Sequence, residues 1–191
     1  MESKLDLVRL AKVLDEVGDP GRMATIATWD KRIQALLFEA AKGFRPVGLD
    51  HFVPTSVPAR TEVLHDGRNT LPLFATLQKR FAKPDDYESD PRLFGYNHQS
   101  MIGFTGPGYF TARPGDPGEV IFDYRSLPDA GTPKPSSWPD IVSNHARLGR
   151  FVFEGLTDQV RALSNHVIVG RASRNGQLLD EWFTMVRKDP R

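Results

Sequence analysis

Apolar residues recur at helical spacing near the start of the chain. One stripe precedes Gly18 at intervals of three and four residues, and charged residues occupy most positions between its members. The members of this stripe are Leu7, Leu10, Ala11, Leu14 and Val17. Ser3 is the predicted N-cap, because its hydroxyl can accept hydrogen bonds from free backbone amides. The pattern therefore predicts an amphipathic helix between Ser3 and Gly18.

Two further helices are expected before residue 90. A second apolar stripe lies between Thr28, a predicted N-cap, and Gly43, which suits the position after a helix end. A third and shorter stripe lies in the segment 69–84, where one proline fits a first helical turn and another ends the helix. The segment 58–65, PARTEVLH, is predicted to be a strand.

Alternation of apolar and polar residues replaces helical spacing after Leu93, which is typical of β-strands. The expected strands lie near residues 96–105, 108–113, 118–125, 149–155, 165–173 and 178–187. One hairpin is strongly specified, because Asn175-Gly176 suits a type I′ turn whose twist matches that of the flanking strands. Arg174 should then lie opposite Gln177.

The hairpin turn also fixes a register for the rest of the two strands. Arg171 then opposes Asp180, Val169 opposes Trp182, Gly170 opposes Glu181, Ile168 opposes Phe183 and His166 opposes Met185. Both faces of this hairpin are largely apolar, so the sheet needs a cover on each face. The helices can cover one face, and a sheet that curls until its other face meets itself covers the second.

We therefore predict an α+β fold, in which N-terminal amphipathic helices pack on a curved, mostly antiparallel, barrel-like sheet of about six to seven strands. In outline this architecture resembles lipocalin-like barrels and the helix-wrapped sheets of small cyclases. No motif assigns the chain to a family. A single domain is expected over residues 1–191, mainly helical in 1–90 and sheet-forming in 91–191. The proline-rich loop 126–143 is either a lid or a crossover.

Composition excludes several classes of function. Lys and Arg number 25 against 24 Asp and Glu, so the basic surplus typical of nucleic-acid binding is missing. The chain has no cysteine, which excludes disulfides, thiol nucleophiles and thiolate metal sites. No apolar run approaches the length of a membrane span, and the N-terminus has no apolar leader segment. We expect a cytoplasmic protein that binds neither membrane nor nucleic acid.

Metal and cofactor motifs are also missing from the sequence. The five histidines, at positions 51, 65, 98, 145 and 166, show no spacing typical of metal ligands. The sequence therefore predicts no metal site and no cofactor. The pattern Ser-Asn-His with Gly-Arg occurs twice, from Ser143 to Arg150 and from Ser164 to Arg171. It indicates either a shared strand-entry device or two imidazoles that meet in one pocket.

The block Leu93–Arg125 combines aromatic rings, turns and ionisable groups, as the wall of a pocket would. Alternate residues of a strand point to opposite faces of the sheet. Either the set with Tyr96 and His98 or the set with Asn97 can face the interior. General acid–base catalysis is the type of chemistry that remains most compatible with the sequence. It needs no motif, only one ionisable group with a shifted pKa beside a pocket. The catalytic candidates are His98, Asp123 and Asp180.

Arg171, Asp180 and Trp182 allow two interpretations. In the first, Arg171 and Asp180 form an ordinary cross-strand ion pair. In the second, Arg171 and Asp180 bind the polar end of a ligand and Trp182 forms an aromatic wall of the cavity. The predicted ligand-binding residues are Tyr96, Tyr109, Tyr124, Arg171 and Trp182.

The leading functional hypothesis is binding of a small, largely apolar molecule in a pocket of the curved sheet. An alternative is a small enzyme of the isomerase, cyclase or lyase type that uses the same pocket for general acid–base chemistry. A third hypothesis is a protein-interaction domain or homodimer that docks through helices or strand edges.

Overall fold

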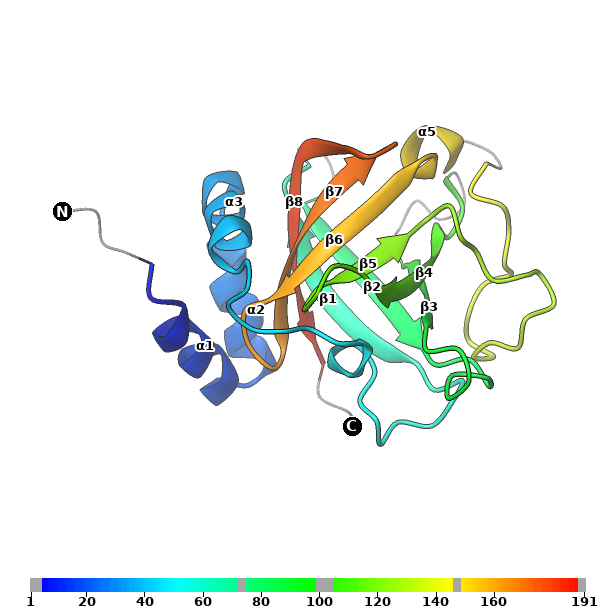
Figure 1. Cartoon of the computed structure of the whole chain (residues 1–191), viewed down its shortest axis with the longest axis horizontal. Helices are drawn as coiled ribbons and strands as arrows, with labels where there is room; N and C mark the ends of the chain where they lie inside the picture. The colour runs from blue at the N-terminus through cyan, green and yellow to red at the C-terminus, as the bar shows by residue number, and fades with distance from the viewer. Residues whose placement is uncertain (1–4, 72–74, 99–104, 146–148, 189–191) are drawn as a thin grey trace.

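Eight antiparallel strands form a closed barrel in the computed structural model, which describes residues 5–71, 75–98, 105–145 and 149–188 (Figure 1). The strands are β1 (Val63–Asn69), β2 (Thr76–Ala82), β3 (Leu93–Asn97), β4 (Tyr109–Pro114), β5 (Val120–Asp123), β6 (Leu156–Ala162), β7 (Val167–Arg174) and β8 (Gln177–Arg187). Each strand pairs with its neighbours in sequence, and β1 pairs with β8 to close the ring. The barrel-like antiparallel sheet predicted from the sequence is confirmed, with eight strands instead of six or seven.

Three helices lie on the outside of the barrel: α1 (Leu7–Glu16), α2 (Asp19–Ala27) and α3 (Lys31–Ala40) (Figure 1). The helix α2 packs against β1 and β8, α3 packs against β7 and β8, and α1 joins the same apolar cluster. The carboxylate of Asp6 caps α1 by accepting from the backbone N–H of Arg9 at 2.9 Å. Asp30 caps α3 in the same way, so the predicted cap Thr28 was wrong. The predicted cap Ser3 lies outside the described residues. The helix α2 was missed because its apolar stripe is short.

Two predicted elements were wrong. The segment 69–84 contains the strand β2 and not a third helix, because Leu77, Lys79 and Phe81 alternate toward the barrel interior. The spacing of Leu77 and Phe81 by four residues also fits a helix, which explains the error. The segment 149–155 forms a short helix, α5 (Gly149–Phe153), where a strand was predicted. Strands therefore begin at Val63, inside the part that was expected to be mainly helical.

The hairpin at Asn175-Gly176 forms as predicted, with φ of 51° and 80° at the two turn residues and Arg174 opposite Gln177. Beyond Ser173 the predicted register was wrong, because an irregularity inserts two extra residues into β8. Arg171 therefore opposes Trp182 and not Asp180. The other observed pairs are Gly170↔Phe183, Val169↔Thr184, Ile168↔Met185 and Val167↔Val186. Because the shift is two residues, each side chain keeps its predicted face.

Aromatic rings fill the interior of the barrel. Phe110 and Phe122 stack there with ring centroids 5.1 Å apart. Two glycines make room for rings on neighbouring strands: a Cβ on Gly95 would lie 2.4 Å from the Phe110 ring, and one on Gly170 would lie 2.2 Å from the Phe183 ring. These strand glycines therefore permit close packing across the barrel interior.

The lower end of the barrel in Figure 1 is closed by the 3-10 turn η1 (Leu49–His51) and by Phe52. The Phe52 ring lies 5.2 Å from the Phe81 ring and 5.7 Å from the His65 ring, measured between centroids. His65 is fully buried among these rings. Burial lowers the pKa of His51 to about 3 and lowers the pKa of His65 well below its usual range.

We expect Gly170→Ala to lower the free energy of unfolding by about 1–3 kcal/mol, because the added methyl group overlaps the Phe183 ring. Urea denaturation measures this change. Gly131→Ala is the matched control, since Gly131 is exposed and a Cβ there has no neighbour within 4 Å. Equal stability of Gly170→Ala and the wild type would contradict the packing described.

Acid is expected to destabilise the closed end of the barrel. Both histidines stay neutral in the folded protein but bind protons in the unfolded chain below pH 6.5, so the free energy of unfolding falls as pH falls from 6.5 toward 3. Urea denaturation at pH 7 and pH 5 measures the slope, and His65→Leu should flatten it. His145→Gln, which removes an exposed histidine, should leave the slope unchanged. An unchanged slope in His65→Leu would refute the assignment.

Candidate functional site

A cavity of about 320 Å³ opens at the end of the barrel opposite η1. Side chains from the barrel rim and from α5 form its largely apolar walls: Leu71, Leu77, Phe151, Val152, Phe153, Leu156, Ala172 and Phe183. Nine polar residues also line it, and four of them, Lys79, Asn97, Tyr124 and Asp158, are hydrogen-bonded to one another. We call these four residues the polar floor, because Lys79, Tyr124 and Asp158 lie above the stacked rings of the interior and are almost fully buried.

The ammonium group of Lys79 is the centre of the polar floor. Its Nζ donates to Asn97 Oδ1 at 2.8 Å and to the hydroxyl of Tyr124, and it lies 3.4 Å from Asp158 Oδ2. Tyr124 in turn donates to Asp158 Oδ2 at 3.2 Å. The side chains of Lys79 and Asp158 are each only 6% exposed, so this ion pair is buried.

Burial pushes the ionisable groups of the polar floor toward their neutral forms. It lowers the pKa of Lys79, while the nearby Asp158 carboxylate opposes that shift. It raises the pKa of Asp158, against the effect of Lys79, and raises the pKa of Tyr124 well above its usual range. The aromatic rings beneath partly replace the lost water around Lys79 Nζ, which lies 5.2 Å from the Phe110 centroid and 5.1 Å from the Tyr124 centroid.

Strand alternation and a buried amide hold the floor in place. Lys79 lies between the inward-facing Leu77 and Phe81 on β2. Asn97 ends β3 and donates through Nδ2 to the carbonyl of Gly108 at 3.1 Å. The buried amide of Asn144 donates to the carbonyl of Tyr124 at 2.9 Å and so anchors the backbone there.

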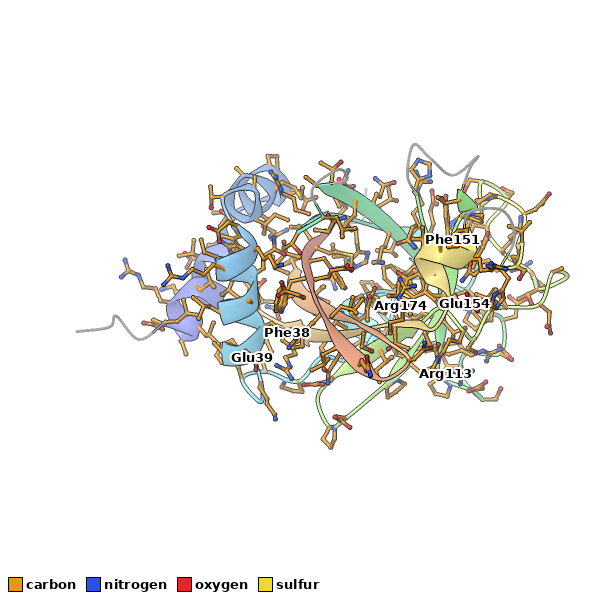
Figure 2. The ribbon with its side chains drawn as sticks, turned by 90° about the horizontal axis from the view of Figure 1, so that it is seen from above. Phe38, Glu39, Arg113, Phe151, Glu154 and Arg174 are labelled. Atoms are coloured by element: carbon orange, nitrogen blue, oxygen red, sulfur yellow. The ribbon has the colours of Figure 1, made fainter. Side chains whose placement is uncertain are left out.

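The short helix α5 covers part of the cavity mouth. Phe153 stacks on Tyr124 with centroids 5.5 Å apart and ring planes 10° apart. The Arg174 guanidinium donates to the carbonyls of Phe151 and Val152, at 3.3 and 3.0 Å, and so ties α5 to the end of β7. Figure 2 shows Phe151 on this helix with Arg174 beside it. Phe151 is 67% exposed, which is unusual for such a large apolar side chain.

Other buried cations in the described residues have structural partners. Lys83 Nζ donates to three backbone carbonyls, those of Pro54, Thr55 and Val57, and holds that loop against β2. Arg161 donates to Glu119 and to the carbonyl of Phe38 and ties α3 to the barrel. Arg161 also lines a separate hollow of about 260 Å³ beside Glu119, and Lys79 differs from both cations in lining the cavity under α5.

The predicted ligand-binding residues are divided between two places. Tyr124 lines the cavity, whereas Trp182 borders it on β8 but packs its ring on the outer face of the barrel, in the apolar cluster under the helices. Tyr96 and Tyr109 lie outside the barrel, packed against Trp138 in the proline-rich loop, and Tyr109 donates to the carbonyl of Pro139 at 2.7 Å. That loop therefore covers the outer face of β3 and β4. Arg171 lies 5.0 Å from the Trp182 ring on the side of α3, where it is 3.7 Å from Glu39.

The structure does not bring the three catalytic candidates together, and none of them lines the cavity. His98 is exposed, with Nδ1 3.3 Å from the hydroxyl of Tyr96. Asp123 pairs with Arg125 at 2.8 Å, and Asp180 pairs with Lys31 on the surface. On β3 the parity of Asn97, and not that of Tyr96, faces the interior.

Sequence reasoning missed Lys79, Asn97 and Asp158. The signal that could have found them is a polar residue at an inward position between apolar ones, as in Leu77, Lys79 and Phe81. Reading that segment as a helix concealed the alternation. Asp158 has the same signal, because Val160 and Ala162 follow it on the inner face of β6.

The two Ser-Asn-His segments share a local turn. The Ser143 hydroxyl accepts from the backbone N–H of His145 at 3.2 Å, and the Ser164 hydroxyl accepts from that of His166 at 3.2 Å. Only the second copy enters a strand, since α5 follows the first. The two imidazoles lie at opposite ends of β6, so the hypothesis that they meet in one pocket was wrong.

Comparison with protein-family models, curated proteins and solved structures finds no significant match. The candidate site therefore depends on geometry alone. Among the described residues, no group of three His, Asp or Glu side chains is arranged to hold a metal ion. In the same part of the chain, no helix has the length and apolar character needed to cross a membrane.

We expect Lys79→Met to lower the free energy of unfolding by about 3–5 kcal/mol, because it leaves the Asp158 carboxylate buried without a cation. The double variant Lys79→Met/Asp158→Asn should recover much of this loss. Urea denaturation measures both. Lys31→Met is the matched control, since it breaks the exposed pair with Asp180 and should cost at most about 1 kcal/mol. A single variant as stable as the control would show that Lys79 and Asp158 are not coupled.

Proposed function

We propose that the cavity above the polar floor binds a small, largely apolar molecule that carries one polar oxygen group. The observation that supports this proposal is a buried ion pair, Lys79 with Asp158, on the wall of a cavity whose other walls are mostly apolar. Carbonyl, carboxylate and hydroxyl oxygens are the groups that Lys79 would recognise by donating a hydrogen bond. We propose the cytoplasm as the site of action, as expected from the sequence.

The cavity volume limits the ligand. A space of about 320 Å³ lies at the lower end of the range for ligand pockets in proteins, which favours a compact molecule with few rings or a short chain. Apolar contact with Leu77, Phe153 and Phe183 would supply most of the affinity, and the polar floor would set the orientation.

A second candidate function is proton-transfer catalysis in the same cavity. It is favoured by one observation: Lys79, Tyr124 and Asp158 are hydrogen-bonded to one another, and burial shifts the pKa of Lys79 down and that of Asp158 up. Such shifts bring an acid and a base closer to neutral pH, where general acid–base catalysis is most efficient. Asp158 or Lys79 would exchange the proton with the substrate, and Tyr124 would orient it.

Ligand binding is tested with anilinonaphthalene sulfonate as a fluorescent apolar probe and by native mass spectrometry of protein purified from its own host. We expect saturable probe binding and a retained small molecule in the wild type. Ala172→Trp fills the cavity from β7 without removing a polar group, so it should abolish both signals. His98→Ala is the control, because His98 lies outside the cavity, and it should leave probe affinity within about twofold of the wild type.

The variants also separate the hypotheses. Probe binding that is insensitive to Ala172→Trp but lost in His98→Ala would refute the cavity and support the site predicted from the sequence. If the retained molecule changes mass on incubation with wild-type protein, and the double variant Lys79→Met/Asp158→Asn binds it unchanged, catalysis is the function. A retained molecule that is stable in both proteins supports binding.

A further inference from the structure

A second hollow lies at the closed end of the barrel, opposite the cavity under α5, and its volume is about 390 Å³. It is bounded by the segment after α3, by η1, by the turn between β6 and β7, and by the end of β8. We call it the basal pocket, with Arg45, His51, Thr55, Ser164 and Arg187 on its walls. It shares no residue with the cavity above the polar floor.

Two guanidinium groups line the basal pocket. Arg187 donates through Nη1 to the carbonyl of His51, which fixes its position against η1. Arg45 Nη1 lies 3.6 Å from the carboxylate of Asp15, beyond hydrogen-bond distance. Asp15 also accepts from the backbone and the side-chain amide of Asn165, at 2.8 and 2.9 Å. Its charge is therefore shared among several donors and neutralises Arg45 only in part.

Basic side chains surround His51. Apart from burial, the groups that lower the pKa of His51 are Arg187, His166 and Arg45, which are all cationic when charged. His51 Nε2 is buried and has no hydrogen-bond partner within the described residues. A positive potential around an unsatisfied polar atom favours an anion that brings its own hydrogen-bonding oxygens.

Two hydroxyl groups add neutral donors. Ser164 accepts from the backbone N–H groups of His166 and Val167, each at 3.2 Å, so its own proton remains to be donated. Thr55 also lines the pocket through an exposed position. The one carboxylate among the lining residues belongs to Asp50, and two arginines on the same wall outnumber it.

We propose that the basal pocket binds a phosphate group, either as inorganic phosphate or as the phosphate of a small ester. Planar guanidinium forks with hydroxyl donors match the several oxygens of a phosphate, and a guanidinium is the side chain best suited to that geometry. The pocket is larger than a phosphate ion, so it has room for an attached organic group. The proposal depends on none of the residues of the polar floor.

The test uses inorganic phosphate and glycerol phosphate, titrated separately into the full-length protein at constant ionic strength maintained with sodium chloride. The readouts are the ring C–H resonances of His51 in NMR spectra and the melting temperature. We expect saturable shifts of the His51 resonances and a rise in melting temperature. Arg45→Gln should weaken the Kd at least about tenfold, because it removes a charged donor to phosphate. Tighter binding of glycerol phosphate would identify an ester as the ligand class, and equal binding would identify free phosphate.

The matched control is Arg113→Gln, which removes an exposed arginine on β4 that is paired with Asp90 at 3.5 Å, and it should leave the Kd unchanged. Arg45→Lys keeps the charge and should bind phosphate with an intermediate Kd. The proposal is overturned if neither phosphate produces a saturable shift, if chloride alone produces the same shift, or if folded Arg45→Gln, checked by circular dichroism, binds as tightly as the wild type.

Discussion

The pairing of β1 with β8 is the interaction on which the rest of the structure depends. It runs from His65↔Arg187 to Asn69↔Phe183 and turns an open sheet into a ring. A closed ring of eight strands encloses a space just wide enough for side chains or for one small ligand. The volume inside the barrel is therefore limited. Whether an inward position carries an aromatic, a charged or a glycine residue determines where the interior is filled and where a cavity remains.

The limited volume of the interior explains the position of the polar floor. Gly95 and Gly170 admit the rings of Phe110 and Phe183, so the lower interior is filled with aromatic groups. The buried ion pair on top of this layer contributes little to the stability of the fold. The free-energy cost of removing its two charges from water is about as large as the free energy gained from their attraction. Lys79 and Asp158 are therefore better explained by what they do at a cavity wall than by what they contribute to folding. The same reasoning does not extend to Lys83, whose three carbonyl partners give it a structural role.

Local chemistry determined which parts of the fold could be predicted. The Asn175-Gly176 turn requires positive φ at both residues, so its hairpin and its two apolar faces could be read from the sequence. These faces predicted a curved, barrel-like sheet, but closure of the ring was left open. The two extra residues in β8 could not be predicted, because they depend on how the strand meets its other neighbours. The same holds for the site: Lys79 and Asp158 come from strands far apart in the chain, and only the closed ring brings their side chains together. His98 and Asp123 were predicted as catalytic candidates because aromatic residues flank them in the sequence. In the structure both side chains lie on the outer face of the sheet or at its rim.

The aromatic layer also separates the two hollows of the barrel. Phe52, Phe81 and Phe122 contact one another with centroids 5.2–5.3 Å apart, between the polar floor on one side and the basal pocket on the other. This layer contains no ionisable group other than His65, which burial keeps neutral. Because the two hollows share no lining residue, substitutions at one should change the energetics of the other only through the packing of these rings. The strand β8 also connects the two hollows, because Arg187 lines the basal pocket and Phe183 lines the cavity above the polar floor.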